Sequence, residues 1–165
     1  MAEARTLEAG KERHSRATAP RRRGPLENTP VRNLIKEAKS WMDEALRLRN
    51  MDQHRAGLAA ERALGLYLAA SRRNLSERGK ADCLFRAGEA LSLAASLCEK
   101  SDPRRAGRLH LEAGDYLHAG AWNGTRPKEE VLKLAREQYV LALGLGGVQR
   151  ILERKIAMCD RALEL

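Results

Sequence analysis

Residues 56–100 read AGLAAERALGLYLAASRRNLSERGKADCLFRAGEALSLAASLCEK, and this stretch decides the fold. In its first half, small and apolar residues recur three and four positions apart, at Ala56, Ala60, Ala63, Tyr67 and Ala70. After a polar break the same spacing returns at Ala81, Leu84, Ala87, Leu91, Ala94 and Cys98. Residues with this spacing share one side of an α-helix. The stretch therefore predicts two helices whose alanine-lined faces pack closely as an antiparallel hairpin.

The composition supports a helical core. Of the 165 residues 43% are hydrophobic but only 4% aromatic, so the core must be aliphatic and rich in alanine. No apolar run approaches the roughly 18 to 20 residues that a membrane span needs, and the N-terminus has no apolar signal segment. Cys83, Cys98 and Cys159 form no CxxC pair and fall on apolar helical positions, as reduced core cysteines do. We therefore expect an intracellular protein, cytoplasmic, with the nucleus as the alternative.

Residues 1–29 have few large apolar side chains and no sustained period, which predicts a disordered basic tail. Three consecutive arginines in this tail, Arg21, Arg22 and Arg23, lie between Pro20 and Pro25. Such a short basic cluster is typical of a solvated linker. The alternative is that it contacts an anionic surface or serves in nuclear import.

The remaining chain predicts six helices, at about residues 30–50, 52–73, 76–100, 103–119, 127–144 and 148–165. The signals for their first residues are Thr29-Pro30, Asp52, Ser76, Asp102-Pro103 and Pro127. The connections are short and no strand is indicated, so neighbouring helices should be antiparallel. The fold class is all-α, with one or two small helical bundles. We expect residues 30–101 to form a three-helix bundle and residues 102–165 to add three helices that pack on it or extend it.

Some positions carry more specific expectations. Trp41 lies in the apolar stripe of the first helix, which favours a core position over an exposed partner contact. Gly57 and Gly65 are eight residues apart in the second helix and indicate close helix contact, because glycine is costly in a helix interior. Asn123-Gly124 is typical of a turn. The apolar residues of the last helix include Ile151, Leu152, Ile156, Cys159, Ala162 and Leu163.

The sequence contains no clear catalytic or metal-binding motif. His110 and His118 are two helical turns apart, about 12 Å, which is too far to share one ion. The glycines between Gly144 and Gly147 follow a helix and lack a GK[ST] ending, so they indicate a helix C-cap and not a phosphate loop. We expect no enzymatic activity, no cofactor and no metal.

The alanine and tyrosine spacing resembles that of the MIT domain (microtubule-interacting and trafficking), a three-helix bundle, over residues 38–99. The matching residues are Ala56, Ala60, Ala63 and Tyr67, followed by Lys80-Ala81 and Arg86-Ala87. The last seven residues, CDRALEL (159–165), also look like the C-terminal end of an MIT third helix. Ala63-Tyr67-Ala70 and Ala135-Tyr139-Ala142 are similar to second helices of tetratricopeptide (TPR) repeats, but the hairpins are not regular 34-residue units.

The resemblance implies a binding module. MIT domains bind short amphipathic helices of ESCRT-type proteins in a groove between helices, and TPR arrays bind peptides on a concave face. Both use an apolar strip with charged rims. On this chain the groove residues would be Tyr67 with Arg62, Arg72 and Arg86, which suit an acidic peptide of a partner protein.

Two alternatives stay open. The net charge of +9 would also suit a protein that binds nucleic acid or an anionic surface. The chain could instead be a structural subunit of a larger complex. The sequence leaves the oligomeric state open.

Overall fold

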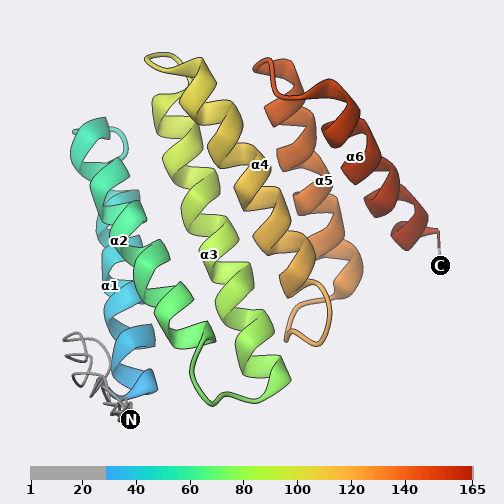
Figure 1. Ribbon diagram of the computed structural model, residues 1–165. Helices are drawn as coiled ribbons and strands as arrows, with labels where there is room; N and C mark the ends of the chain where they lie inside the picture. The colour runs from blue at the N-terminus through green and yellow to red at the C-terminus, as the bar shows by residue number, and fades with distance from the viewer. Residues whose placement is uncertain (1–28, 165) are drawn as a thin grey trace, which may run out of the picture.

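The computed structural model describes residues 29–164, and in this range it contains six helices and no strand (Figure 1). The helices are α1 (Val31–Leu48), α2 (Gln53–Ser71), α3 (Glu77–Cys98), α4 (Pro103–Gly120), α5 (Lys128–Gly144) and α6 (Gln149–Leu163). The all-α prediction is confirmed. The predicted disordered tail and its three arginines, Arg21, Arg22 and Arg23, lie outside the described residues.

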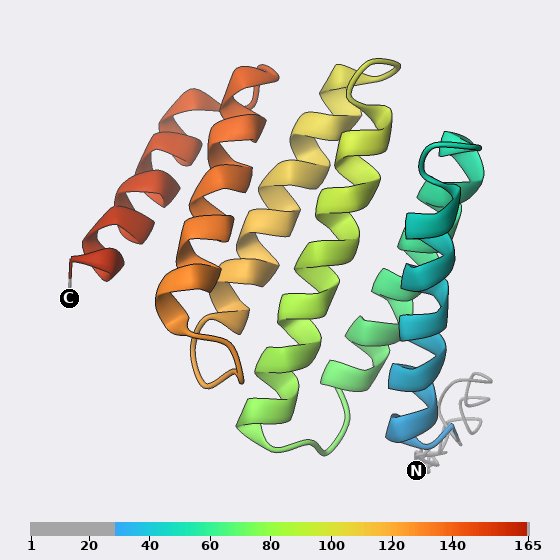
Figure 2. The ribbon, with the colours of Figure 1, turned by 180° about the vertical axis from the view of Figure 1, so that it is seen from behind.

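The helices pack in the order of the sequence, each antiparallel to the next (Figures 1 and 2). The extensive interfaces are those between consecutive helices, and α5 with α6 is the smallest of them. This arrangement is a row with α1 and α6 at its two ends. The division into residues 30–101 and 102–165 stays a prediction, and α3 and α4 pack against each other across it.

Side-chain caps mark three helix starts where the sequence predicts them. The carboxylates of Asp52 and Asp102 each accept a hydrogen bond from the backbone N–H three residues later, both at 2.9 Å. The hydroxyl of Ser76 accepts one from the N–H of Gly79 at 3.2 Å. Pro103 opens α4 as expected, whereas Pro30 and Pro127 occupy the cap position just before α1 and α5.

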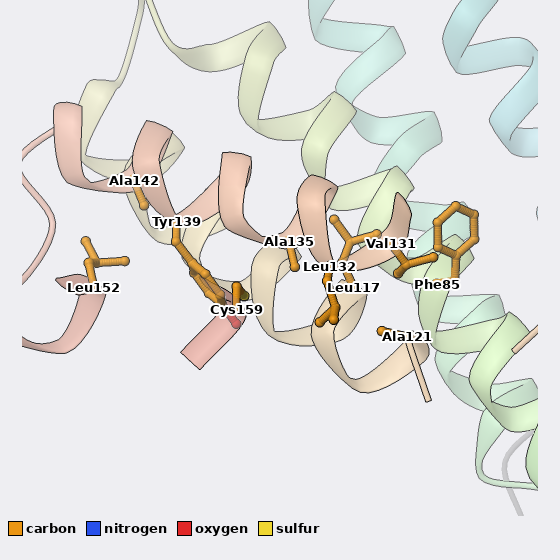
Figure 3. Packing of buried hydrophobic residues seen from close by; sticks show 10 residues of the cluster. All are labelled: Phe85, Leu117, Ala121, Val131, Leu132, Ala135, Tyr139, Ala142, Leu152 and Cys159. Atoms are coloured by element: carbon orange, nitrogen blue, oxygen red, sulfur yellow. The ribbon is translucent and has the colours of Figure 1, made fainter. Parts of the chain in front are cut away.

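Alanine dominates the interior, as the composition predicts. One core cluster joins α1, α2 and α3 and includes Leu34, Ala63, Tyr67 and Ala87. A second lies among α4, α5 and α6 and receives Phe85 from α3 (Figure 3). Trp41 is half-buried at the edge of the first cluster, which agrees with its predicted place in the apolar stripe.

Glycines do permit close helix contact, but at other positions than predicted. A Cβ added at Gly57 or Gly65 would meet no atom within 4 Å, so the expected close contact there is wrong. The tight positions are Gly88, Gly114 and Gly120, where an added Cβ would collide with Leu117, with the ring of Tyr139 and with the backbone of Phe85 respectively. The α3–α4 and α4–α5 interfaces are therefore the ones that require glycine.

The glycines after α5 form a helix C-cap, as predicted. Gly146 has a φ of +81°, the left-handed conformation that glycine adopts without strain. The N–H groups of Gly146 and Gly147 donate to the carbonyls of Leu143 and Ala142 at 3.1 and 3.0 Å. The chain then turns into α6.

Candidate functional site

A hollow of about 270 Å³ lies between α1, α3 and the connection from α4 to α5, and we call it the α1/α3 groove. It includes Tyr67 and Arg86, two of the four residues predicted for a partner groove. Its lining residues are Ile35, Lys39, Tyr67, Gly79, Asp82, Cys83, Phe85, Arg86, Thr125 and Arg126. Four separate elements therefore contribute to it.

The floor of the groove is apolar and uncharged. Tyr67 and Phe85 are 2% and 4% exposed, and Cys83 is buried beside them. Burial raises the pKa of the Tyr67 hydroxyl and of the Cys83 thiol, which keeps both groups protonated at neutral pH. The floor therefore offers aromatic and aliphatic surface and no reactive thiolate.

The rim of the groove is basic. The guanidinium carbons of Arg126 and Arg86 lie 4.9 and 5.6 Å from the centroid of the Phe85 ring, within the range of cation–π attraction. Lys39 adds a third cation from α1, against the single carboxylate of Asp82. Arg86 Nη1 also donates to Glu89 at 2.7 Å, outside the groove lining. Guanidinium groups in this setting suit a carboxylate ligand.

Hydrogen bonds to α3 hold the connection that carries Arg126. The backbone N–H and the hydroxyl of Thr125 both donate to Oδ1 of Asp82, at 2.7 and 2.9 Å. Asn123 has a φ of 70°, and a Cβ at Gly124 would lie 2.9 Å from the carbonyl oxygen of Gly120. The predicted Asn-Gly turn is thus confirmed, and it brings Arg126 back over Phe85.

The other two predicted groove arginines lie elsewhere. The guanidinium carbon of Arg62 is 4.6 Å from the centroid of the Trp41 ring, beside a separate hollow on the α1–α2 surface. Arg72 is the exposed C-cap residue of α2. It lies near Tyr116 of α4, whose pKa is raised by burial and partly lowered by this arginine. The structure therefore brings Tyr67 and Arg86 together and separates both from Arg62 and Arg72.

Sequence reasoning did not find Lys39, Asp82 and Arg126. Asp82 and Thr125 are 43 residues apart, so their contact depends on how α3 and α4 pack. The Asn-Gly turn was a local signal for a tight connection at this place. It did not reveal which helix the connection would contact.

A buried histidine of α4 links the C-cap residue of α3 to α5, away from the groove. His110 is 1% exposed, its Nε2 lies 3.0 Å from Oε1 of Glu99, and its Nδ1 lies 2.7 Å from Oε1 of Gln138. Both ring nitrogens are therefore occupied by protein contacts. Across residues 29–164 no three His, Cys, Asp or Glu side chains converge in a way that would hold a metal ion.

Cys83, Cys98 and Cys159 are free cysteines, and the first and last are buried in the core as predicted. Burial raises the pKa of all three thiols. None of the helices within residues 29–164 is long and apolar enough to cross a membrane.

Comparison with protein-family models, with curated proteins and with solved structures finds no match. Residues 29–164 form an all-helical domain of six helices.

Proposed function

We propose that the protein is a non-catalytic adaptor that binds a peptide or amphipathic helix of a partner protein in the α1/α3 groove. One observation carries the proposal: three cations, Lys39, Arg86 and Arg126, surround an apolar floor and come from three separate elements. An apolar strip with charged rims is the pattern used when a helix or peptide lies in a groove.

The size of the groove favours side chains as its contents. Its volume of about 270 Å³ is below the roughly 300 to 1,000 Å³ of small-molecule pockets. A bound segment would insert one apolar side chain against Phe85 and Tyr67. A carboxylate next to that side chain would then pair with Arg126 or Lys39 on the rim.

The alanine and tyrosine spacing, which resembles that of MIT and TPR helices, supports the same class of function. Under that resemblance the partner would belong to a trafficking or ESCRT-type assembly, and its helix would be acidic. Tyr67, which carries part of the resemblance, is also a groove residue here. The proposed binding surface therefore includes one of the residues that carry the resemblance.

A displayed library of random peptides, selected on the full chain, tests the proposal. We expect the selected peptides to combine acidic and large apolar residues. Fluorescence anisotropy should show about a tenfold loss of affinity for Arg126→Glu and for Lys39→Glu, since each removes one charge-assisted contact and adds repulsion. Arg108→Glu, an exposed site on α4, is the matched control for net charge. Equal affinity in all four proteins would refute the proposal.

Nucleic-acid binding is the second candidate, because the chain carries a net charge of +9. A single-stranded oligo-dT probe in the same assay separates the two. Polyanion binding should weaken steeply as salt rises, since counterions are released on binding. Capture in an apolar groove should change much less. Tight, salt-sensitive binding of the oligonucleotide, with no peptide selected, would favour this candidate.

A further inference from the structure

The outer side of α6 carries a second apolar strip, separate from the one that packs on α5. Ile151 and Met158 are seven residues apart and are 48% and 41% exposed. We call Ile151 and Met158 the α6 strip. Together with Arg150, Arg154 and Lys155 they line a surface hollow of about 430 Å³. The buried residues of α6 are Leu152 and Cys159, whereas Ile151 is exposed.

The two ends of the row differ. End helices of a stacked array need a polar outer face, because no neighbour covers it. Among the described residues, Leu46 is the one large hydrophobic residue of α1 that is exposed, and Met51, just after α1, is 75% exposed. The α6 end exposes Ile151 and Met158, preceded by Val148 at 62% exposure. Figures 1 and 2 show α6 at the edge of the row with α5 as its neighbour. Thus α6 exposes two large apolar residues seven positions apart on one face, whereas α1 exposes a single one.

The charges of α6 are sorted around this strip. Arg154 and Arg161 each follow an exposed apolar residue, Ile151 or Met158, by three positions, so both lie on the same side of it. The acidic residues Glu153 and Asp160 follow the same two residues by two positions, which places them away from the strip. Asp160 accepts from Nε of Arg136 on α5 at 2.5 Å. The edge of the strip therefore presents cations to a ligand.

One of the cations beside the strip, Lys155, is already paired with a carboxylate. Lys155 donates to Asp115 of α4, and Asp115 also accepts from the hydroxyl of Tyr139 at 2.8 Å. This pairing holds α6 to α4 and α5 on the side opposite the arginines. Arg150, Arg154 and Arg161 remain as the cations that border the strip on its outer side.

We propose that the α6 strip docks an acidic amphipathic helix of a partner protein. Two apolar side chains at i and i+7 match the one-face spacing of a helix, and the arginine row complements acidic flanks. An antiparallel two-fold contact with a second copy of this chain is disfavoured, because it would set one arginine row against another. A lipid surface would gain little from two partly buried apolar side chains. This docking is independent of the α1/α3 groove.

The probe is a synthetic peptide of about 18 residues, long enough to form a helix, with leucine on one face and glutamate beside it. We expect anisotropy to show binding by the full chain and about a tenfold or greater loss in two double variants, Ile151→Ser with Met158→Ser and Arg154→Glu with Arg161→Glu. All four substituted residues are exposed, so neither double variant changes the core. Circular dichroism checks that each variant is folded. Arg108→Glu is the charge control and should bind normally.

The outcomes separate this proposal from the groove. Arg126→Glu should leave binding of the leucine–glutamate peptide unchanged while it weakens the library-selected peptides. The proposal is overturned if both double variants bind as well as the wild type, or if a version of the peptide with lysine for glutamate binds equally. It is also overturned if the strip residues instead control capture by phosphatidylserine vesicles or dimer formation in sedimentation.

Discussion

Gly114→Ala tests the packing between α4 and α5 directly. Gly114 lies within α4, and an added Cβ would come within 2.7 Å of Cδ1 and 2.9 Å of Cζ of Tyr139, and closer still to Cε1. The ring has little freedom to move, because it is 2% exposed and its hydroxyl donates to Asp115 at 2.8 Å. The helices must therefore separate or the ring must leave its position.

The size of the effect follows from two opposing terms. Alanine is favoured over glycine in a helix interior by about 1 kcal/mol. Overpacking of a close-packed core costs about 1 to 3 kcal/mol, and contact with three ring atoms places this site near the upper value. The expected net loss is about 2 kcal/mol. For a chain of this size that corresponds to a fall in Tm of about 4 to 8 °C.

Gly57→Ala and Gly65→Ala are the matched controls. These residues also lie in a helix, but an added Cβ meets no atom within 4 Å. Both variants should gain up to about 1 kcal/mol, because the propensity term acts alone. Thermal and urea unfolding, followed by far-ultraviolet circular dichroism, measures all three. If Gly114→Ala is as stable as the two controls, the close contact between α4 and Tyr139 is refuted.

Three further predictions concern the groove connection and pH. Asp82→Ala removes the acceptor of two Thr125 hydrogen bonds and should cost about 1 to 2 kcal/mol; it should also speed hydrogen exchange at the Thr125 amide, and unchanged exchange would contradict the role of Asp82. Burial and the nearby Lys155 lower the pKa of His118 below 6.5, so the folded state favours the neutral ring and stability should fall as pH drops below 6.5. Urea unfolding of His118→Gln should show a smaller fall, and an identical pH dependence would contradict the assignment. Burial and a hydrogen bond to Asp115 raise the pKa of Tyr139 above 10.0, so stability should decline as pH rises beyond 10.0. In urea unfolding Tyr139→Phe should lose less stability there than the wild type, and an equal loss would contradict this role of Tyr139.

Local signals were sufficient to find the helices. Asp52, Ser76 and Asp102 cap the helices that they were expected to cap, because a side-chain acceptor near the first N–H groups acts over three residues. The alanine spacing identified the buried face of α2 correctly for the same reason. Both signals depend only on neighbours along one helix.

Signals that depend on a second helix were harder to interpret. Gly57 and Gly114 both lie in a helix, and only the packing of α5 against α4 shows that Gly114 is the crowded one. Ile151 and Leu152 are adjacent in sequence, but the direction from which α5 approaches α6 decides that Leu152 is buried.

The candidate site shows the same limit. Tyr67 and Arg86 were predicted as groove residues from the resemblance and from their place beside the alanine faces, whereas Arg126 lies at the groove on the connection after α4. Its distance from Arg86 in the sequence gives no hint of this contact. The basic rim could therefore be recognised only from the structure.

The most direct test of the groove as a partner-binding surface is a methyl NMR titration of the full chain with a library-selected peptide. The three isoleucines act as probes: Ile35 lines the groove, Ile151 lies on the α6 strip, and Ile156 packs at the α5–α6 interface. Binding in the groove predicts that the Ile35 signal moves and saturates with the peptide while the Ile156 signal stays in place. If a peptide binds and the Ile35 signal stays unchanged, the α1/α3 groove is not the surface that binds the partner.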